Sequence, residues 1–171
     1  MKTFWLAASL LFLVASAQAQ PVDTFEGPVI GPQGSPIGKI WVRSSENATV
    51  FRIRIDPGGL SPGWHGMHVH AVGDCSDPGR FERAKGHVNF ENARHGLLHP
   101  EGPEEGDLPN LFVNADGSAN AEVSSESVVL RGELGLQDAD GSALVIHAGE
   151  DDHLSQPIGN AGARVACAPV K

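Results

Sequence analysis

The sequence has 171 residues, which is a usual length for one domain and short for two. Hydrophobic residues make up 40% and charged residues 19%, so the chain can form a packed core and is not a generally disordered protein. The formal net charge of -9 argues against a nucleic-acid binder and against electrostatic docking to an anionic membrane, because both need a basic surface.

The first 19 residues have the pattern of a cleaved signal peptide. Lys2 supplies a positive charge, residues 4–14 are almost wholly apolar, and Ala17-Gln18-Ala19 matches the small-x-small pattern before a cleavage site. This apolar run is shorter than the roughly 20 residues that span a bilayer, and no later stretch is long enough. We therefore expect removal of 1–19 and export of 20–171, without a membrane anchor, to a bacterial periplasm or the cell exterior.

The sequence has only two cysteines, Cys75 and Cys167, and both lie in the part that we expect to be exported. In an oxidising compartment an even pair favours one disulfide over two buried free thiols. There is no C-x-x-C pair, so a redox-active dithiol is not indicated.

Short apolar or alternating segments separated by turns predict an all-β fold. The 21 Gly and 12 Pro favour turns, and no stretch has a helical apolar period over three turns. In Val50–Asp56 the residues alternate cleanly between apolar and charged, as in a half-buried strand. Several short strands of this kind predict a sandwich or a barrel. The expected strands, in chain order, are Ile37–Arg43, Val50–Asp56, Trp64–Ala71, Ala119–Leu130, Ala143–Ala148 and Ala163–Ala168.

Between the third and fourth predicted strands, residues 73–109 form a long irregular segment rich in Gly, Pro, His and acids. A loop of this length in a compact domain is usually functional or disordered.

The histidines point to a metal site. His68 and His70 are two residues apart on a predicted strand, so their rings project from one face. Imidazole suits copper and zinc, and carboxylates follow in the irregular segment. All eight histidines lie within 65–153: His65, His68, His70, His87, His95, His99, His147 and His153.

Seven segments together resemble copper/zinc superoxide dismutases, and the exported bacterial branch is the closer likeness. The resemblance runs in order from about Val22 to the C-terminus. The segments are Leu60–His70, Gly73–Cys75, Gly86–Asn89, His95-Gly96, Gly106–Asn110, Leu144–Gly149 and Gly159–Cys167.

The resemblance implies an eight-stranded Greek-key β-barrel or sandwich with long metal-binding and active-site loops. It implies an enzyme that converts superoxide to dioxygen and hydrogen peroxide by copper redox cycling. Copper would be bound by His68, His70, His87 and His147, and His87 would also bridge to zinc. Arg164 would bind and orient the superoxide anion, so the expected catalytic residues are Arg164 and His87.

The resemblance also assigns supporting roles to residues outside the copper set. Cys75 and Cys167 match the family's disulfide. Asp151 matches a carboxylate that hydrogen-bonds one copper histidine and one zinc histidine, which fixes the orientation of both rings. His65 matches a structural histidine, and His153 has no assigned role, so we expect it at the surface.

The zinc site departs from the family pattern of three histidines and one aspartate. His87, His95 and Asp107 match, but Glu104 stands where the remaining histidine should be. Three outcomes are open: Glu104 binds zinc through oxygen, His99 replaces it, or the site is weak or empty.

Two further interpretations compete with a copper/zinc dismutase. A non-catalytic copper- or zinc-binding relative is opposed by the complete copper set and Arg164. A copper-only dismutase is opposed by the retention of His95 and Asp107. A monomer and a homodimer are both compatible with the sequence.

Overall fold

The computed structural model describes residues 21–132 and 134–171. The predicted signal peptide, 1–19, lies outside the described residues. In the described ranges the chain forms nine strands and one 3-10 turn. They are β1 (Asp23–Ile30), β2 (Pro36–Ser44), β3 (Thr49–Ile55), β4 (Gly63–His65), β5 (Met67–His70), the turn η1 (Glu82–Ala84), β6 (Leu111–Val113), β7 (Ala119–Ser125), β8 (Ser142–His147) and β9 (Arg164–Val170).

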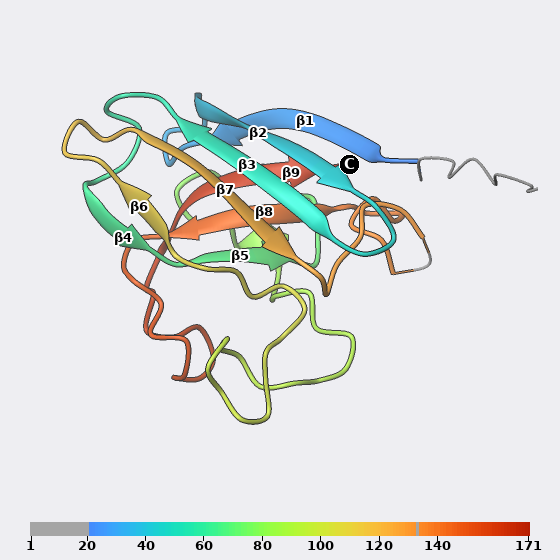
Figure 1. Ribbon diagram of the computed structural model, residues 1–171. Coiled ribbons are helices and arrows are strands. Elements are labelled where there is room, and N and C mark those ends of the chain that lie inside the picture. Colours follow the sequence, from blue (N-terminus) through green and yellow to red (C-terminus); the bar gives the residue numbers. More distant parts are fainter. Residues whose placement is uncertain (1–20, 133) are drawn as a thin grey trace, which may run out of the picture.

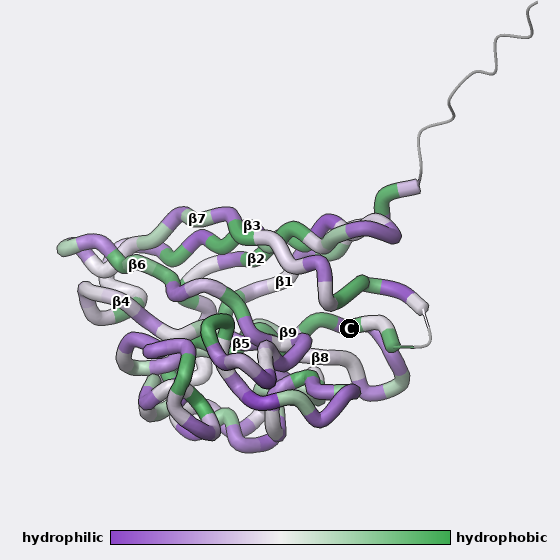
Figure 2. The backbone as a smooth tube through the Cα atoms, turned by 60° about the horizontal axis from the view of Figure 1, so that its bottom comes forward, coloured by the Kyte–Doolittle hydropathy of each residue, from purple (hydrophilic) through white to green (hydrophobic). Residues whose placement is uncertain are grey.

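Seven of these strands form one antiparallel sheet in the order β5-β8-β9-β1-β2-β3-β7, and β4 pairs with β6 in a small second sheet. The large sheet curls, so that β1, β2, β3 and β7 form one layer and β5, β8 and β9 form the other (Figures 1 and 2). The layers are joined where Ile30 of β1 pairs with Cys167 of β9. The expectation of an all-β barrel or sandwich is confirmed.

The core lies between the two layers and follows from the alternation of the strands. In β3, Phe51 and Ile53 are fully buried, whereas Arg52 and Arg54 are more than half exposed. Leu144 of β8 belongs to the same apolar cluster from the opposite layer. Each buried aliphatic or aromatic side chain contributes roughly 1.5–3 kcal/mol, and this burial holds the two layers together.

Two predicted strand boundaries were wrong. The predicted strand Trp64–Ala71 is divided at Gly66 into β4 and β5. A Cβ at Gly66 would lie 2.7 Å from that of Ala161, so the backbone turns there against a neighbouring loop. The predicted strand Ala119–Leu130 ends at Ser125. Beyond it the backbone bonds to side chains instead of a neighbouring strand: Thr49 Oγ1 donates to the carbonyl of Val128 at 2.6 Å.

Two strands were not predicted. In β1 the apolar alternation is interrupted by Gly27 and Pro28, and β6 has only three residues. Both are recognised only through their partners, β2 and β4.

The irregular segment predicted at 73–109 lies with residues 148–163 beneath the sheet, against β5 and β8 (Figure 1). Backbone hydrogen bonds fix it to β5: Val69 N donates to Gly106 O at 2.8 Å, and Val88 N donates to Val69 O at 2.9 Å. A Cβ at Gly106 would lie 2.3 Å from Val69 O, so only glycine allows this approach. No helix among the described residues is long and apolar enough to cross a membrane.

The disulfide Cys75–Cys167 ties this loop to β9, with 5.8 Å between the Cα atoms and a sequence separation of 92. Closing a loop of that length restricts the unfolded chain, and loss of such a bond costs roughly 2–5 kcal/mol. We therefore expect the double substitution C75S/C167S to lower the free energy of unfolding by that amount in urea titrations. An unchanged urea midpoint would show that the bond does not contribute to stability.

Candidate metal centre

Four histidines from three parts of the chain meet beneath the sheet. His68 and His70 lie on β5, His147 ends the neighbouring strand β8, and His87 comes from the long loop. Isolated bridges pair His68 with Asp107 and His70 with His87, and so bring the loop against β5. One nitrogen from each ring lies within 4.8 Å of the others. The predicted copper set is therefore assembled in space.

Each of these rings presents one buried nitrogen without a hydrogen-bond partner among the described residues. These atoms are Nδ1 of His68 and Nε2 of His70, His87 and His147. Buried polar atoms are nearly always hydrogen-bonded, so four such nitrogens directed at one another indicate a binding site for a metal ion. A set of four imidazole nitrogens suits copper.

The opposite nitrogen of each ring is held by an oxygen acceptor. His70 Nδ1 donates to Lys85 O at 2.8 Å, and His147 Nδ1 donates to Gly162 O at 2.9 Å. His68 Nε2 lies 2.7 Å from Asp151 Oδ2. Because a carbonyl or carboxylate only accepts, these contacts place the proton on the outer nitrogen and leave the inner lone pair free.

Burial keeps three of these rings neutral. Desolvation is the largest effect on each ring. The pKa of His68 is lowered, that of His70 lies well below its usual value, and that of His147 is lowered to about 3. A neutral ring has a lone pair for a metal, whereas a protonated ring has none.

A second group adjoins the first and shares His87 with it. It comprises His87, His95, Glu104 and Asp107, with ligand atoms within 4.8 Å of one another. His87 Nδ1 lies 2.5 Å from Glu104 Oε2, and His95 Nδ1 lies 2.8 Å from Asp107 Oδ1. Since Nε2 of His87 faces the first group and Nδ1 the second, one imidazole ring lies between the two candidate metal positions.

Of the two candidates for the fourth zinc ligand, the structure brings Glu104 into this group and leaves His99 outside it. The backbone N–H of Glu104 donates to Asp107 Oδ2 at 3.0 Å, and this contact places the carboxylate among the histidines. His99 Nδ1 instead accepts a hydrogen bond from the backbone N–H of Glu101 at 3.1 Å.

The carboxylates and rings of the second group hold one another in their charged forms. Burial opposes the charge on Glu104, but its contacts with His87 and His95 lower its pKa to about 2. Burial also disfavours a charge on His95, yet Asp107, Asp151 and Glu104 raise its pKa to about 11. The group thus concentrates negative oxygen donors where a divalent cation would replace the protons.

Asp151 connects the two groups from behind. It accepts from His68 Nε2 at 2.7 Å and lies 3.2 Å from His95 Nε2, as the resemblance implies. Asn110 holds it through two hydrogen bonds, from its Nδ2 to Asp151 O at 2.8 Å and from Asp151 N to its Oδ1 at 2.9 Å. Gly159 has a φ of +57° and passes so close to the Asp151 carboxylate that any side chain there would collide with it.

Arg164 lies at the entrance to the four-histidine group. Its two terminal nitrogens donate to the carbonyls of Phe81 and Lys85 at 2.6 Å each. With His147 and Ile158 it lines a surface hollow of about 400 Å³. Because the Lys85 carbonyl also holds His70, the position of the cation is coupled to that of a candidate copper ligand.

Comparison with known proteins is consistent with this arrangement. The family described as "Copper/zinc superoxide dismutase (SODC)" matches residues 37–170. A copper/zinc superoxide dismutase of Caulobacter vibrioides is 46% identical over 142 residues, covering 81% of this chain and 80% of that protein. One from Aquifex aeolicus is 38% identical and covers 97% and 96%. The chain belongs to the copper/zinc superoxide dismutase family.

Solved structures extend the likeness to the fold. A superoxide dismutase-like protein from Bacillus subtilis superposes with a TM-score of 0.79 at 35% identity, covering 85% of this chain and 97% of that chain. The copper/zinc superoxide dismutase from Brucella abortus superposes with a TM-score of 0.69 at 28% identity, covering 87% and 100%. The family of copper/zinc superoxide dismutases uses copper and zinc, and each of the two residue groups described above could bind a metal ion.

The remaining histidines of this dismutase family member are placed differently. His65 is buried between the carbonyls of His147 and Ser61, at 2.6 and 2.8 Å, in keeping with a structural role. His153, which we expected at the surface, is half-buried: its side chain is 19% exposed and its Nε2 lies 3.1 Å from Asn110 Nδ2. Its Nδ1 lies 3.7 Å from Asp151 Oδ2, a contact that the sequence did not predict.

Several residues that orient the ligands were missed from the sequence. The carbonyls of Lys85 and Gly162 hold His70 and His147, and Gln156 bonds the backbone of His95 through both ends of its amide. Carbonyl oxygens leave no signal in residue type. Asn110 lies in a matched segment and could have been singled out there.

These pKa shifts predict how the stability of the chelated protein depends on pH. Below about pH 6.5 the unfolded chain binds protons that the buried, neutral rings of His68, His70 and His147 do not bind. The free energy of unfolding therefore decreases as the pH is lowered, by up to about 1.4 kcal/mol per pH unit for each ring. The lowered pKa of Glu104 adds to this loss below about 4.5. Above 6.5, His95 keeps a proton only when folded, so stability falls as pH rises.

Urea titrations of chelated protein from pH 4 to 9 should therefore give a maximum near pH 6.5. A free energy of unfolding that stays constant between pH 5 and 6.5 would contradict the assignment of neutral buried rings.

Proposed function

We propose that the protein is a copper-dependent superoxide dismutase that converts two superoxide ions and two protons to dioxygen and hydrogen peroxide. The observation that supports this most strongly is the set of four buried, unpartnered imidazole nitrogens beside Arg164. His68, His70, His87 and His147 would hold copper. Copper would supply the one-electron chemistry, accepting an electron from one superoxide ion and giving it to the next.

Zinc would be held by His87, His95, Asp107 and Glu104. A set of two imidazoles and two carboxylates is acceptable to zinc, and the two carboxylates balance its charge. The contribution of this group to catalysis would be to fix the His87 ring from its Nδ1 side and so leave Nε2 directed at the copper position.

Two side chains of the chain itself would act on the substrate. Arg164, held by two carbonyls at the entrance, would attract superoxide into the hollow and orient it despite the negative net charge. His87 would carry a proton on Nε2 to the departing peroxide, and the second proton would come from water. Export through the N-terminal segment would place this activity outside the cytoplasm.

A non-catalytic metal-binding role is the alternative, and two observations favour keeping it. Glu104 departs from the family's zinc ligands, and one relative, 37% identical over 142 residues, carries the name "Superoxide dismutase-like protein YojM" of Bacillus subtilis. The substitution R164Q separates the two functions, because Arg164 is not among the proposed ligands.

We expect R164Q to keep its copper and to lose about 10-fold or more of its dismutase activity, together with part of the dependence of the rate on ionic strength. Stopped-flow or pulse-radiolysis rates at several salt concentrations measure both. R131Q removes an exposed cation that pairs with Asp23 at 3.2 Å, and it should leave the rate unchanged. Equal rates for R164Q and the wild type would remove Arg164 from the mechanism, whereas an inactive, copper-loaded wild type would favour the non-catalytic role.

A further inference from the structure

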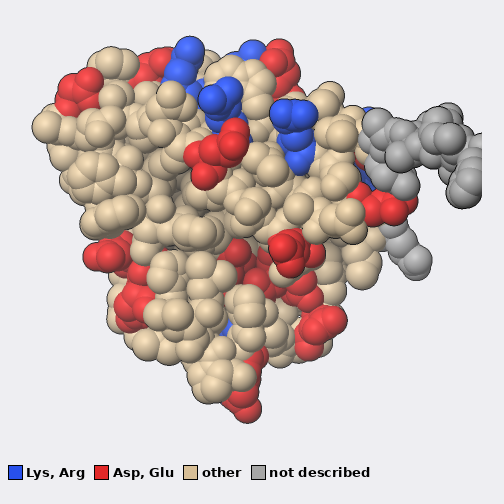
Figure 3. Space-filling view, in the orientation of Figure 1, with Lys and Arg blue, Asp and Glu red and all other residues tan. Residues whose placement is uncertain are grey.

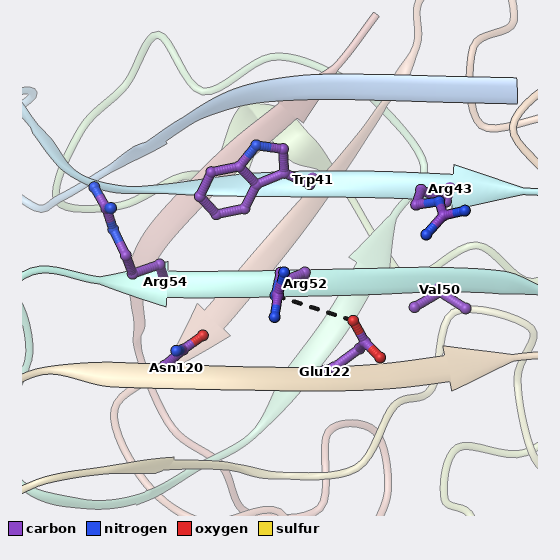
Figure 4. A pocket seen from close by; sticks show the side chains of 7 residues that line it. All are labelled: Trp41, Arg43, Val50, Arg52, Arg54, Asn120 and Glu122. Atoms are coloured by element: carbon purple, nitrogen blue, oxygen red, sulfur yellow. Dashed lines mark ion pairs between the residues drawn. The ribbon is translucent and has the colours of Figure 1, made fainter.

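A second hollow, of about 450 Å³, lies on the outer face of β2, β3 and β7, in the layer opposite the histidine groups (Figure 4). The proposed function makes no use of it. Its lining residues are Trp41, Arg43, Val50, Arg52, Arg54, Asn120 and Glu122.

Strand register explains why these side chains share one face. Trp41 of β2 pairs with Arg52 of β3, which pairs in turn with Glu122 of β7. Arg54 pairs with Asn120 one step along. Trp41, Arg52 and Glu122 therefore form one row across the three strands. Arg54 and Asn120 form a second row beside it, and both rows are directed away from the core.

The face carries a small excess of positive charge although the protein is acidic. Four of the 12 Lys and Arg residues of the chain lie here, against a net charge of -9: Lys39, Arg43, Arg52 and Arg54. Three carboxylates, those of Glu26, Asp56 and Glu122, lie among them. In Figure 3 the blue side chains gather over the layer that contains β2, β3 and β7, whereas red side chains dominate around the loops below. Such a separation of charge favours an anionic partner on this face.

The three arginines are available to a partner, whereas Lys39 pairs with Glu26 at 3.0 Å. Arg52 and Arg54 are 61% and 54% exposed, and their ion pairs, with Glu122 at 4.0 Å and with Asp56 at 3.4 Å, lie at the surface where water competes. Arg43 makes no ion pair with any residue that the structure describes. A guanidinium group binds carboxylate, sulfate or phosphate through two parallel hydrogen bonds, so three of them around one hollow form a set of anion receptors.

Trp41 adds a flat apolar surface to these charges. The ring is half-buried, Lys39 Nζ lies 5.3 Å and the Arg54 guanidinium 6.0 Å from its centre, and it lies beside Arg52 in Figure 4. The carbon-bound hydrogens on the face of a sugar ring pack well against such a surface. Asn120 and Glu122 provide a donor and acceptors at the edge, as sugar hydroxyl groups require.

We propose that this face binds an acidic polysaccharide, with the arginines on its carboxylate or sulfate groups and Trp41 against a sugar ring. A single-stranded nucleic acid fits less well, because Glu122 would lie beside its phosphates, whereas the hydroxyl groups of a polysaccharide can donate to that carboxylate. An acidic peptide would satisfy the arginines but would leave Trp41 without a function.

The test is calorimetric titration of the protein with an oligomer of uronic acids, at low salt and again at higher salt. We expect saturable binding that weakens as salt rises. R52Q/R54Q should weaken binding about 10-fold or more, and W41A should do the same without any change of charge. R94Q/R131Q removes two exposed cations elsewhere and should bind as the wild type does. Copper content and dismutase activity should be equal in all four proteins.

Four outcomes would overturn the proposal. The first is no binding of the oligouronate by the wild type at low salt. The second is equal binding by W41A, which would leave a charge effect alone. The third is equal binding of a neutral oligosaccharide of the same length. The fourth is tighter binding of poly-glutamate or single-stranded DNA than of the oligouronate, which would assign the face to a different class of partner.

Discussion

Replacing His87 with alanine is expected to lower dismutase activity by about 100-fold or more while the protein remains folded. His87 is the one residue that belongs to both metal groups, with Nε2 in the first and Nδ1 beside Glu104 and Asp107 in the second. H87A leaves three histidines for copper, so the metal should stay bound but lose the ring that carries the proton and fixes its geometry. Zinc affinity should fall in the same variant, because only three of the four proposed zinc ligands remain: His95, Glu104 and Asp107.

The measurement is activity per bound copper, with both metals quantified and the fold checked by circular dichroism. H99A is the matched control: His99 comes from the same loop but bonds the backbone N–H of Glu101 and belongs to neither group. H87A with activity within about threefold of the wild type, at equal copper content, would show that the shared ring is not part of the reaction.

Replacing Glu104 with glutamine is expected to weaken zinc binding by about 100-fold and to leave copper binding unchanged. The carboxylate lies 2.5 Å from His87 Nδ1 and 3.5 Å from His95 Nδ1, and its pKa of about 2 keeps it ionised at any pH at which zinc binds. An amide has the same size but no charge, and zinc prefers the anionic oxygen. Changes to residues that hydrogen-bond a metal ligand typically lower metal affinity 10- to 100-fold, and loss of one of the four ligands itself should lower it at least as much.

Competition with a coloured zinc chelator measures this affinity. E105Q is the control, because the neighbouring carboxylate accepts from the backbone N–H of Phe90 and lies outside the group. E104H restores the family's usual ligand and should bind zinc at least as tightly as the wild type. If E104Q binds zinc normally and the additional change H99A abolishes binding, then His99 is the fourth ligand.

The part of the site that could be predicted from the sequence is the part encoded by short-range spacing. The i, i+2 spacing of His68 and His70 placed both rings on one face of a strand, and the structure has them there on β5. The split of that strand at Gly66 was not predictable, because it depends on a contact with Ala161, 95 positions away in the chain. Strand β6 exists only through its pairing with β4.

The choice between Glu104 and His99 also depended on tertiary structure. Both lie near the other ligands in sequence, and zinc accepts both residue types. The structure brings in Glu104 because its backbone N–H bonds the carboxylate of Asp107, whereas the ring of His99 bonds the backbone of its own turn. Likewise, the carbonyls that set the tautomers of His70 and His147 come from residues 15 positions away and carry no side-chain signature.

The most direct test of the central claim, that the four unpartnered nitrogens hold a copper ion that dismutates superoxide, is the activity of the copper-loaded protein with and without added zinc. We predict one tightly bound copper per chain and high dismutase activity that rises when zinc is added. A folded protein that binds one copper at these histidines and has no dismutase activity, with or without zinc, would contradict the account.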